Sequence, residues 1–81
     1  MITRKETLKI IAENIRVERA RKKYSQEYLA EQVNISPQHL YRIENEKVCP
    51  TILVIANIAL ALGISLDTIL PLEELKKFEE K

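Results

Sequence analysis

The chain has 81 residues, of which 46% are hydrophobic and 31% charged, and its formal net charge is +1. This length allows one domain with a modest core, and the composition excludes a disordered chain or an integral membrane protein. The positive charge is concentrated at one end, since residues 1–23 sum to +5 and residues 24–48 and 49–81 to −2 each. This end could attract phosphate groups as a positive patch. The alternative is that its lysines and arginines only keep the surface of a helix solvated.

The first segment predicts a long helix over Arg4–Lys22. Thr3 followed by Glu6 matches a capping box, and apolar residues then recur at helical spacing. These apolar residues are Leu8, Ile11, Ala12 and Ile15. Arg19 falls on the same apolar stripe, where a guanidinium is costly to bury unless it is paired, so we expect it to have a partner.

Two short helices are predicted next. Ser25 is suited to cap the first of them, and Asn34 to end it in a left-handed conformation. Ser36 and Pro37 give an N-cap and a proline at the first helical position of the second. The short connection favours a steep crossing, as in a helix-turn-helix. Inward residues are expected at Leu29, Ala30, Val33, Leu40 and Ile43, and outward residues at Pro37, Gln38, His39, Tyr41 and Arg42.

A fourth helix is predicted over Ile52–Leu62, in which ten of the 11 residues are apolar. Gly63 is suited to close it, and the segment is far shorter than the roughly 20 residues of a bilayer-spanning helix. We expect Ile52, Ile55, Ala59 and Leu62 to face the core. Ser65 is predicted to cap a short fifth helix in which Leu66, Ile69 and Leu70 face inward. Residues 71–81 form either a last amphipathic helix or a partly ordered tail.

The fourth helix is apolar all round, which indicates burial on more than one side. We therefore expect a two-fold symmetric homodimer through this helix and the tail. The interface residues would be Leu53, Val54, Leu60, Leu72, Leu75 and Phe78. The alternative is that the tail folds back over the same helix within one chain.

Four separated motifs agree in order and spacing with a known family. They stand at residues 25–30 (SQEYLA), 34–36 (NIS), 40–45 (LYRIEN) and 61–67 (ALGISLD). Over about residues 10–70 the chain thereby resembles the phage-repressor (Cro/cI-like, XRE) helix-turn-helix family. The resemblance implies an all-α fold, a compact five-helix lambda-repressor-like domain whose third helix reads DNA, with either a short C-terminal helix or a tail after it.

The resemblance places base-reading positions at Pro37, Gln38, Tyr41 and Arg42, with His39 nearby. Arginine bonds both acceptors of guanine in the major groove, glutamine pairs with adenine, and proline offers only apolar contact to a thymine methyl. Arg42 and Gln38 are therefore the leading candidates. The alternatives are a solvated charge for Arg42, and packing or phosphate contact for His39 and Tyr41.

Other matching positions have supporting roles in the family. The resemblance assigns phosphate contacts to Gln26 and Asn45, although Asn45 could cap its helix instead or as well. Lys47 adds positive charge beside Asn45, and Ser36 is a further expected phosphate contact. It also joins Arg19 to Glu44 in a structural ion pair.

Two positions depart from the family pattern. Glu46 stands where glycine is usual, so a left-handed turn there would cost about 1 kcal/mol or more. Asn34 also replaces a common glycine, which is a milder exchange.

The sequence predicts a sequence-specific regulator of transcription that binds double-stranded DNA, namely a dimeric repressor reading a near-palindromic operator through the third helix. The alternative is an antitoxin or adaptor that uses the same fold and whose partner covers the fourth helix.

Catalysis is not expected, because His39 and Cys49 are the only imidazole and thiol and stand alone. There is no metal-ligand spacing and no phosphate-binding glycine loop, so we expect no cofactor and no metal. We also expect no small-molecule ligand, since no sensing domain is evident. One cysteine and no leader favour the cytoplasm, with no membrane association.

Overall fold

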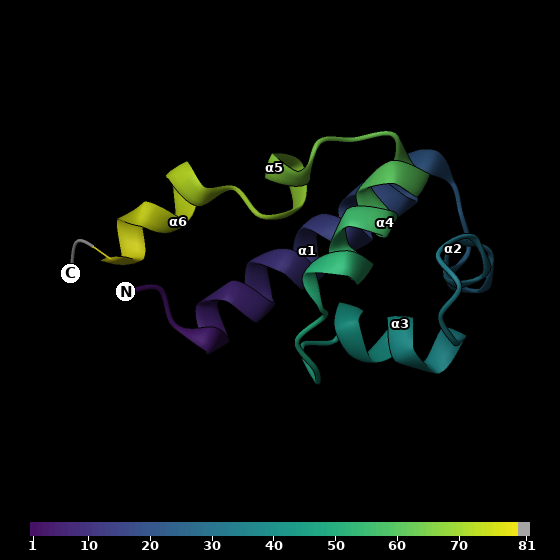
Figure 1. The fold of residues 1–81 in the computed structure, drawn as a ribbon, viewed down its shortest axis with the longest axis horizontal. Helices are drawn as coiled ribbons and strands as arrows, with labels where there is room; N and C mark the ends of the chain where they lie inside the picture. Colours follow the sequence, from purple (N-terminus) through teal and green to yellow (C-terminus); the bar gives the residue numbers. More distant parts are fainter. Residues whose placement is uncertain (80–81) are drawn as a thin grey trace.

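The computed structural model describes the backbone of residues 1–79 and the side chains of residues 1–76. In that part of the chain the regular elements are six helices and no strands. They are α1 (Arg4–Lys22), α2 (Gln26–Gln32), α3 (Pro37–Glu44), α4 (Ile52–Leu62), α5 (Leu66–Ile69) and α6 (Leu72–Glu79). The predicted all-α class is confirmed, and of the two alternatives for the end of the chain, the described residues form the helix α6 (Figure 1).

Side-chain caps fix where the helices begin. The Thr3 hydroxyl accepts from the Glu6 amide at 3.1 Å, and the Glu6 carboxylate accepts from the Thr3 amide at 3.3 Å, which completes the predicted capping box. Ser25, Ser36 and Thr51 each accept a hydrogen bond from the amide three residues ahead. The predicted starts of these four helices are therefore confirmed.

Left-handed residues mark the turns that follow the helices. Gly63 has φ 68° after α4, and Asn34 has φ 60° after α2, both as predicted. Glu46 has φ 62° in the loop after α3. A β-carbon is disfavoured in this conformation, so the loop keeps the geometry that glycine would adopt and bears a steric cost.

Replacing Glu46 by Gly is expected to stabilise the fold by about 1 kcal/mol, because relief of the left-handed strain exceeds the extra chain entropy of glycine in the unfolded state. For a domain of this size the melting temperature should rise by about 4–8 °C. Asn34→Gly is the control and should gain less, because asparagine tolerates the conformation better. A melting temperature that does not rise in Glu46→Gly would contradict the argument.

The core lies where α1 and α4 pack against the shorter helices. It is almost entirely aliphatic, and its fully or nearly fully buried members include Ile11, Ile15, Leu29, Ala30, Leu40, Ile43, Ile55, Ile58, Leu62 and Ile69. Two predicted core positions were wrong. Ile52 is 64% exposed, because Pro50 just before it is buried and Ile58 faces the core instead. Leu66 is 41% exposed at the start of the four-residue α5.

Helix α6 folds back beside the start of the chain (Figure 1). Leu75 is fully buried within the chain, and it lines a shallow depression together with Ile2 and Leu72. Its expected place in a dimer interface is therefore corrected, because a side chain covered by its own chain cannot meet a partner. Leu72 is 62% exposed. The side chain of Phe78 lies outside the described residues.

Candidate nucleic-acid interface

Helices α2 and α3 form a tight pair with only residues 33–36 between them. Leu29 and Ala30 are buried on the inner side of α2, and Leu40 and Ile43 on the inner side of α3. Ser36 caps α3, and Pro37 occupies its first turn, where a missing amide hydrogen costs nothing. The second helix of the pair is thus held rigidly with one face free.

The free face of α3 carries the residues assigned to base reading. Pro37, Gln38, Tyr41 and Arg42 are exposed, whereas His39 is half-buried. Gln38, His39 and Arg42 line one side of a shallow surface depression that continues over Ile35 and Ser36. Polar donors and acceptors on a rigid exposed helix are what a reader of base edges in the major groove requires.

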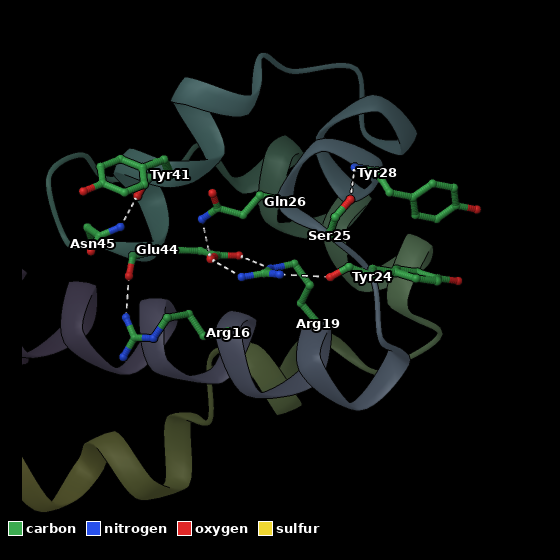
Figure 2. Close-up of polar contacts among 9 residues, drawn as sticks. All are labelled: Arg16, Arg19, Tyr24, Ser25, Gln26, Tyr28, Tyr41, Glu44 and Asn45. Carbon is green, nitrogen blue, oxygen red and sulfur yellow. Dashed lines mark hydrogen bonds and ion pairs between the residues drawn. The ribbon is translucent and has the colours of Figure 1, made fainter.

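Beneath that face lies an ion pair between α1 and the last residue of α3 (Figure 2). Arg19 Nε donates to Glu44 Oε2 at 2.7 Å, and Arg19 Nη2 donates to Glu44 Oε1 at 2.9 Å. The side chain of Glu44 is 1% exposed and that of Arg19 is 20% exposed. This two-point contact fixes the direction as well as the distance of α3 from the scaffold.

Further polar groups complete this network. Gln26 Nε2 donates to Glu44 Oε1 at 2.9 Å, and Arg19 Nη1 donates to the carbonyl oxygen of Tyr24 at 2.9 Å. Arg16 donates to the backbone carbonyl of Glu44, at the end of α3. The hydrogen bond with Glu44 raises the pKa of the Arg19 guanidinium above its ordinary value. Partial burial of Arg19 acts in the opposite direction and lowers the pKa, but its effect is smaller. The pair therefore favours the charged form that arginine already has in proteins.

The residues assigned to phosphate lie at both ends of α3 and at the start of α2. Gln26 uses one amide hydrogen on Glu44, and its second amide hydrogen is chemically able to serve a phosphate. The Ser36 hydroxyl accepts from the amide of His39 at 3.0 Å. Asn45 Nδ2 donates to the Tyr41 carbonyl at 2.8 Å, so Asn45 caps the end of α3, as the alternative role for this residue predicted. Lys47 is exposed two residues further on.

The outer face of α4 is apolar and uncovered. Leu53 is 67% exposed and Leu60 is 78% exposed. Val54, assigned to the same face, is half-buried and packs against the core. The exposed part of the expected interface is therefore narrower than the sequence suggested.

Three contributors were not identified from the sequence. Arg16 binds the end of α3, the carbonyl of Tyr24 accepts from Arg19, and Asn14 Nδ2 donates to the carbonyl of Ile69 at 3.0 Å. The only available signal was position, because Arg16 and Arg19 are three residues apart and share a helix face. Every residue has a backbone carbonyl, so the sequence does not show which of them accepts a side-chain hydrogen bond.

No group of side chains that could hold a metal ion is present in the described part of the chain. Within the same part, no single helix is long and apolar enough to cross a membrane. Only Ile52–Leu62 taken together with Leu66–Lys76, across a bend of 107°, reaches the required length and hydropathy.

A capped helix pair, with its second helix exposed on one side and anchored by an ion pair on the other, defines a helix-turn-helix DNA-binding domain. The family model described as "Helix-turn-helix" (HTH_3) matches residues 15–69. The chain belongs to this family, whose members are DNA-binding regulators of transcription rather than enzymes.

Solved structures agree with this assignment. A hypothetical transcription factor, NHTF from Neisseria, superposes with a TM-score of 0.78 at 29% identity, over 91% of this chain and 87% of that one. The clp gene regulator ClgR from Corynebacterium glutamicum gives a TM-score of 0.78 at 25% identity, over 88% and 73%. A transcriptional regulator from Vibrio cholerae matches over 83% of this chain but only 38% of its own. Among curated proteins, none matches this chain by sequence.

Proposed function

We propose that this chain is a sequence-specific, cytoplasmic regulator of transcription that represses by binding a near-palindromic operator as a homodimer. The observation that carries the proposal is the exposed face of α3, on which Gln38 and Arg42 stand over the buried pair of Arg19 and Glu44. A planar guanidinium and an amide discriminate guanine and adenine in the major groove. In this proposal, residues 1–81 form a single helix-turn-helix domain.

The proposed phosphate contacts position α3 without reading sequence. Gln26 stands at the start of α2, and Asn45 and Lys47 follow the end of α3. These two locations bracket the reading helix, so a phosphate bound at each would fix its depth and its register in the groove. Ser36 is the fourth proposed phosphate contact, because its hydroxyl accepts the cap hydrogen bond from the His39 amide and can still donate its own hydrogen to a phosphate oxygen.

Selection of binding sites from random duplex DNA tests the function directly. Purified wild-type chain should enrich one short motif in two inverted copies, with centres about one helical turn, or roughly 34 Å, apart. Enrichment of no motif would overturn the proposal. A chain that is soluble, or that selects DNA, only when co-expressed with another protein would favour the antitoxin or adaptor function instead.

The proposed dimer uses the exposed leucines of α4. Leu53 and Leu60 are seven residues apart and so lie on one face of the helix, about 10 Å from each other along its axis. In a two-fold interface the same face meets itself, so two exposed leucines from each copy become buried together. Ile52, which is also 64% exposed, borders them. Leu72 on α6 is a further exposed candidate.

Replacing Leu53 and Leu60 together by Gln is expected to yield a monomer, because the substitutions remove the apolar area that drives association and disturb no buried contact. Affinity for the two-copy operator should fall by about tenfold or more, while affinity for one half-site stays unchanged. Light scattering and titration of labelled duplexes measure the two effects. Val17→Gln, at a 43% exposed apolar position on α1, is the control and should remain dimeric. A wild-type monomer at tens of micromolar would contradict the dimer.

A further inference from the structure

Three basic side chains share one face of α1. Lys5, Lys9 and Arg16 are separated by four and seven residues, and all three are exposed. Ala12 lies beside the same line and is fully buried, so the three exposed basic residues border the buried side of the helix. We name Lys5, Lys9 and Arg16 the α1 basic stripe.

The α1 basic stripe runs alongside the end of α3 and the loop that follows it. Arg16 donates to the carbonyl of Glu44, the last residue of α3. Lys5 lines a shallow depression with Glu46, which lies in the loop after α3. In Figure 1 the start of α1 lies on the same side of the molecule as α3 and this loop. The stripe therefore extends the surface on which α3 is exposed.

The two lysines of the stripe have no partner among the side chains that the structure describes. Among the described side chains, neither the Lys5 nor the Lys9 ammonium takes part in a hydrogen bond or an ion pair. Arg4 lines the same depression as Lys5, and Lys47 adds a further positive charge in the loop after α3. These basic residues outnumber the nearby acidic ones, which are Glu46 in the loop and Glu6 and Glu13 on α1. The region is therefore positive and open to a polyanion.

We propose that the α1 basic stripe binds the sugar-phosphate backbone of the same duplex, on the flank beyond the base pairs that α3 contacts. The inference rests on the proposed function. Lysine offers a mobile point charge that serves phosphate without reading sequence, so the stripe contributes affinity and orientation rather than specificity. Eleven residues separate Lys5 from Arg16, which is about 16 Å along the helix, or about five base-pair steps of 3.4 Å.

A charge-matched pair of double variants tests the stripe. Lys5→Gln with Lys9→Gln should weaken binding to the selected operator about tenfold at low salt. It should also make the slope of log affinity against log salt concentration shallower by about two for each bound copy of the chain. The control is Lys22→Gln with Lys23→Gln, which removes the same charge at the opposite end of α1, where the ammonium of Lys22 lies near Gly63 at the end of α4. The control should match wild type in affinity and slope.

Duplex length gives a second readout. Trimming about five flanking base pairs from the operator should weaken wild-type binding but leave the Lys5/Lys9 variant unchanged, because the variant no longer contacts that flank. The ratio of specific to non-specific affinity should remain at the wild-type value in the Lys5/Lys9 variant.

The outcomes separate the two proposals. If the Lys5/Lys9 variant matches the Lys22/Lys23 control in affinity and slope while wild type still prefers its selected site, the stripe is overturned and the proposed function stands. If wild type shows no preference for any sequence, the proposed function fails and the stripe fails with it. Equal losses in both double variants would indicate a general charge effect and would also overturn the stripe.

Discussion

Replacing Arg19 by Met is expected to destabilise the fold by about 3 kcal/mol or more, because it leaves the carboxylate of Glu44 buried without its charged partner. That carboxylate is 1% exposed, and two of its hydrogen bonds come from Arg19. Small domains have a stability of about 5–15 kcal/mol, so the loss is a large share of the total. The melting temperature should fall by about 12 °C or more, measured by circular dichroism.

Replacing Glu44, the other member of the pair, is expected to lower the free energy of unfolding by less than Arg19→Met does. Glu44→Gln keeps the shape of the side chain and its place beside Gln26, and it leaves a guanidinium that is already 20% exposed and can regain water. Truncation by Glu44→Ala also removes the acceptor for Gln26 and should fall between the two. A melting temperature unchanged in Glu44→Ala would show that the pair does not hold α3 to α1.

An exposed arginine on the same helix provides the control. Arg21 pairs with Glu18 at 3.2 Å, but its side chain is 72% exposed. An exposed pair of this kind contributes at most about 1 kcal/mol, so Arg21→Met should hardly change the melting temperature. Equal losses in Arg19→Met and Arg21→Met would contradict the argument that burial gives the Arg19 pair its importance.

Local chemistry explains why most of the fold could be predicted. Caps at Thr3, Ser25 and Ser36 act on amides only three residues away, and Gly63 acts within its own turn. Interactions between residues this close in the chain can be recognised from the sequence alone. The starts of α1 to α4 could therefore be placed without any knowledge of tertiary contacts. Ser65 was also expected to cap α5, but it makes no side-chain cap hydrogen bond there.

The errors lie where the tertiary arrangement decides. Helical spacing gave Ile52 the same direction as Ile55, but Ile52 is 64% exposed and Pro50, two residues before it, is buried instead. Leu75 was assigned to a partner although its own chain covers it, because periodicity marks an apolar face without saying what packs on it. The demand of Arg19 for a partner followed from physics, whereas the choice of Glu44 came from the resemblance.

Replacing Arg42 by Ala is expected to weaken binding to the selected operator by about 1–3 kcal/mol for each bound copy, or roughly 5- to 150-fold. The physical reason is the loss of a two-point contact to guanine. Because Arg42 is exposed, the free energy of unfolding should stay within about 0.5 kcal/mol of the wild-type value. Titration of wild type and variant against the operator and against operators changed at single base pairs measures the effect.

The pattern of loss distinguishes base reading from charge. If Arg42 reads a guanine, the variant should lose its preference at one base pair in each half-site and bind bulk DNA almost as well as before. Arg42→Lys keeps the charge but cannot form the planar two-point contact, so it should lose the same preference while retaining the salt slope. Gln38→Ala should relax a neighbouring base pair in the same way.

A solvated surface charge gives a different result. Arg42→Ala would then reduce affinity for every sequence equally, and Arg42→Lys would restore it, because only the positive charge would matter. The exposed Arg21→Ala removes the same charge from α1 and shows how large such a general effect is. Because Arg42 and Gln38 are four residues apart on one face of α3, loss of preference at two neighbouring base pairs would follow from a single docked orientation of that helix. If Arg42→Ala and Gln38→Ala both keep the wild-type base-pair preferences, α3 does not read the sequence of the operator.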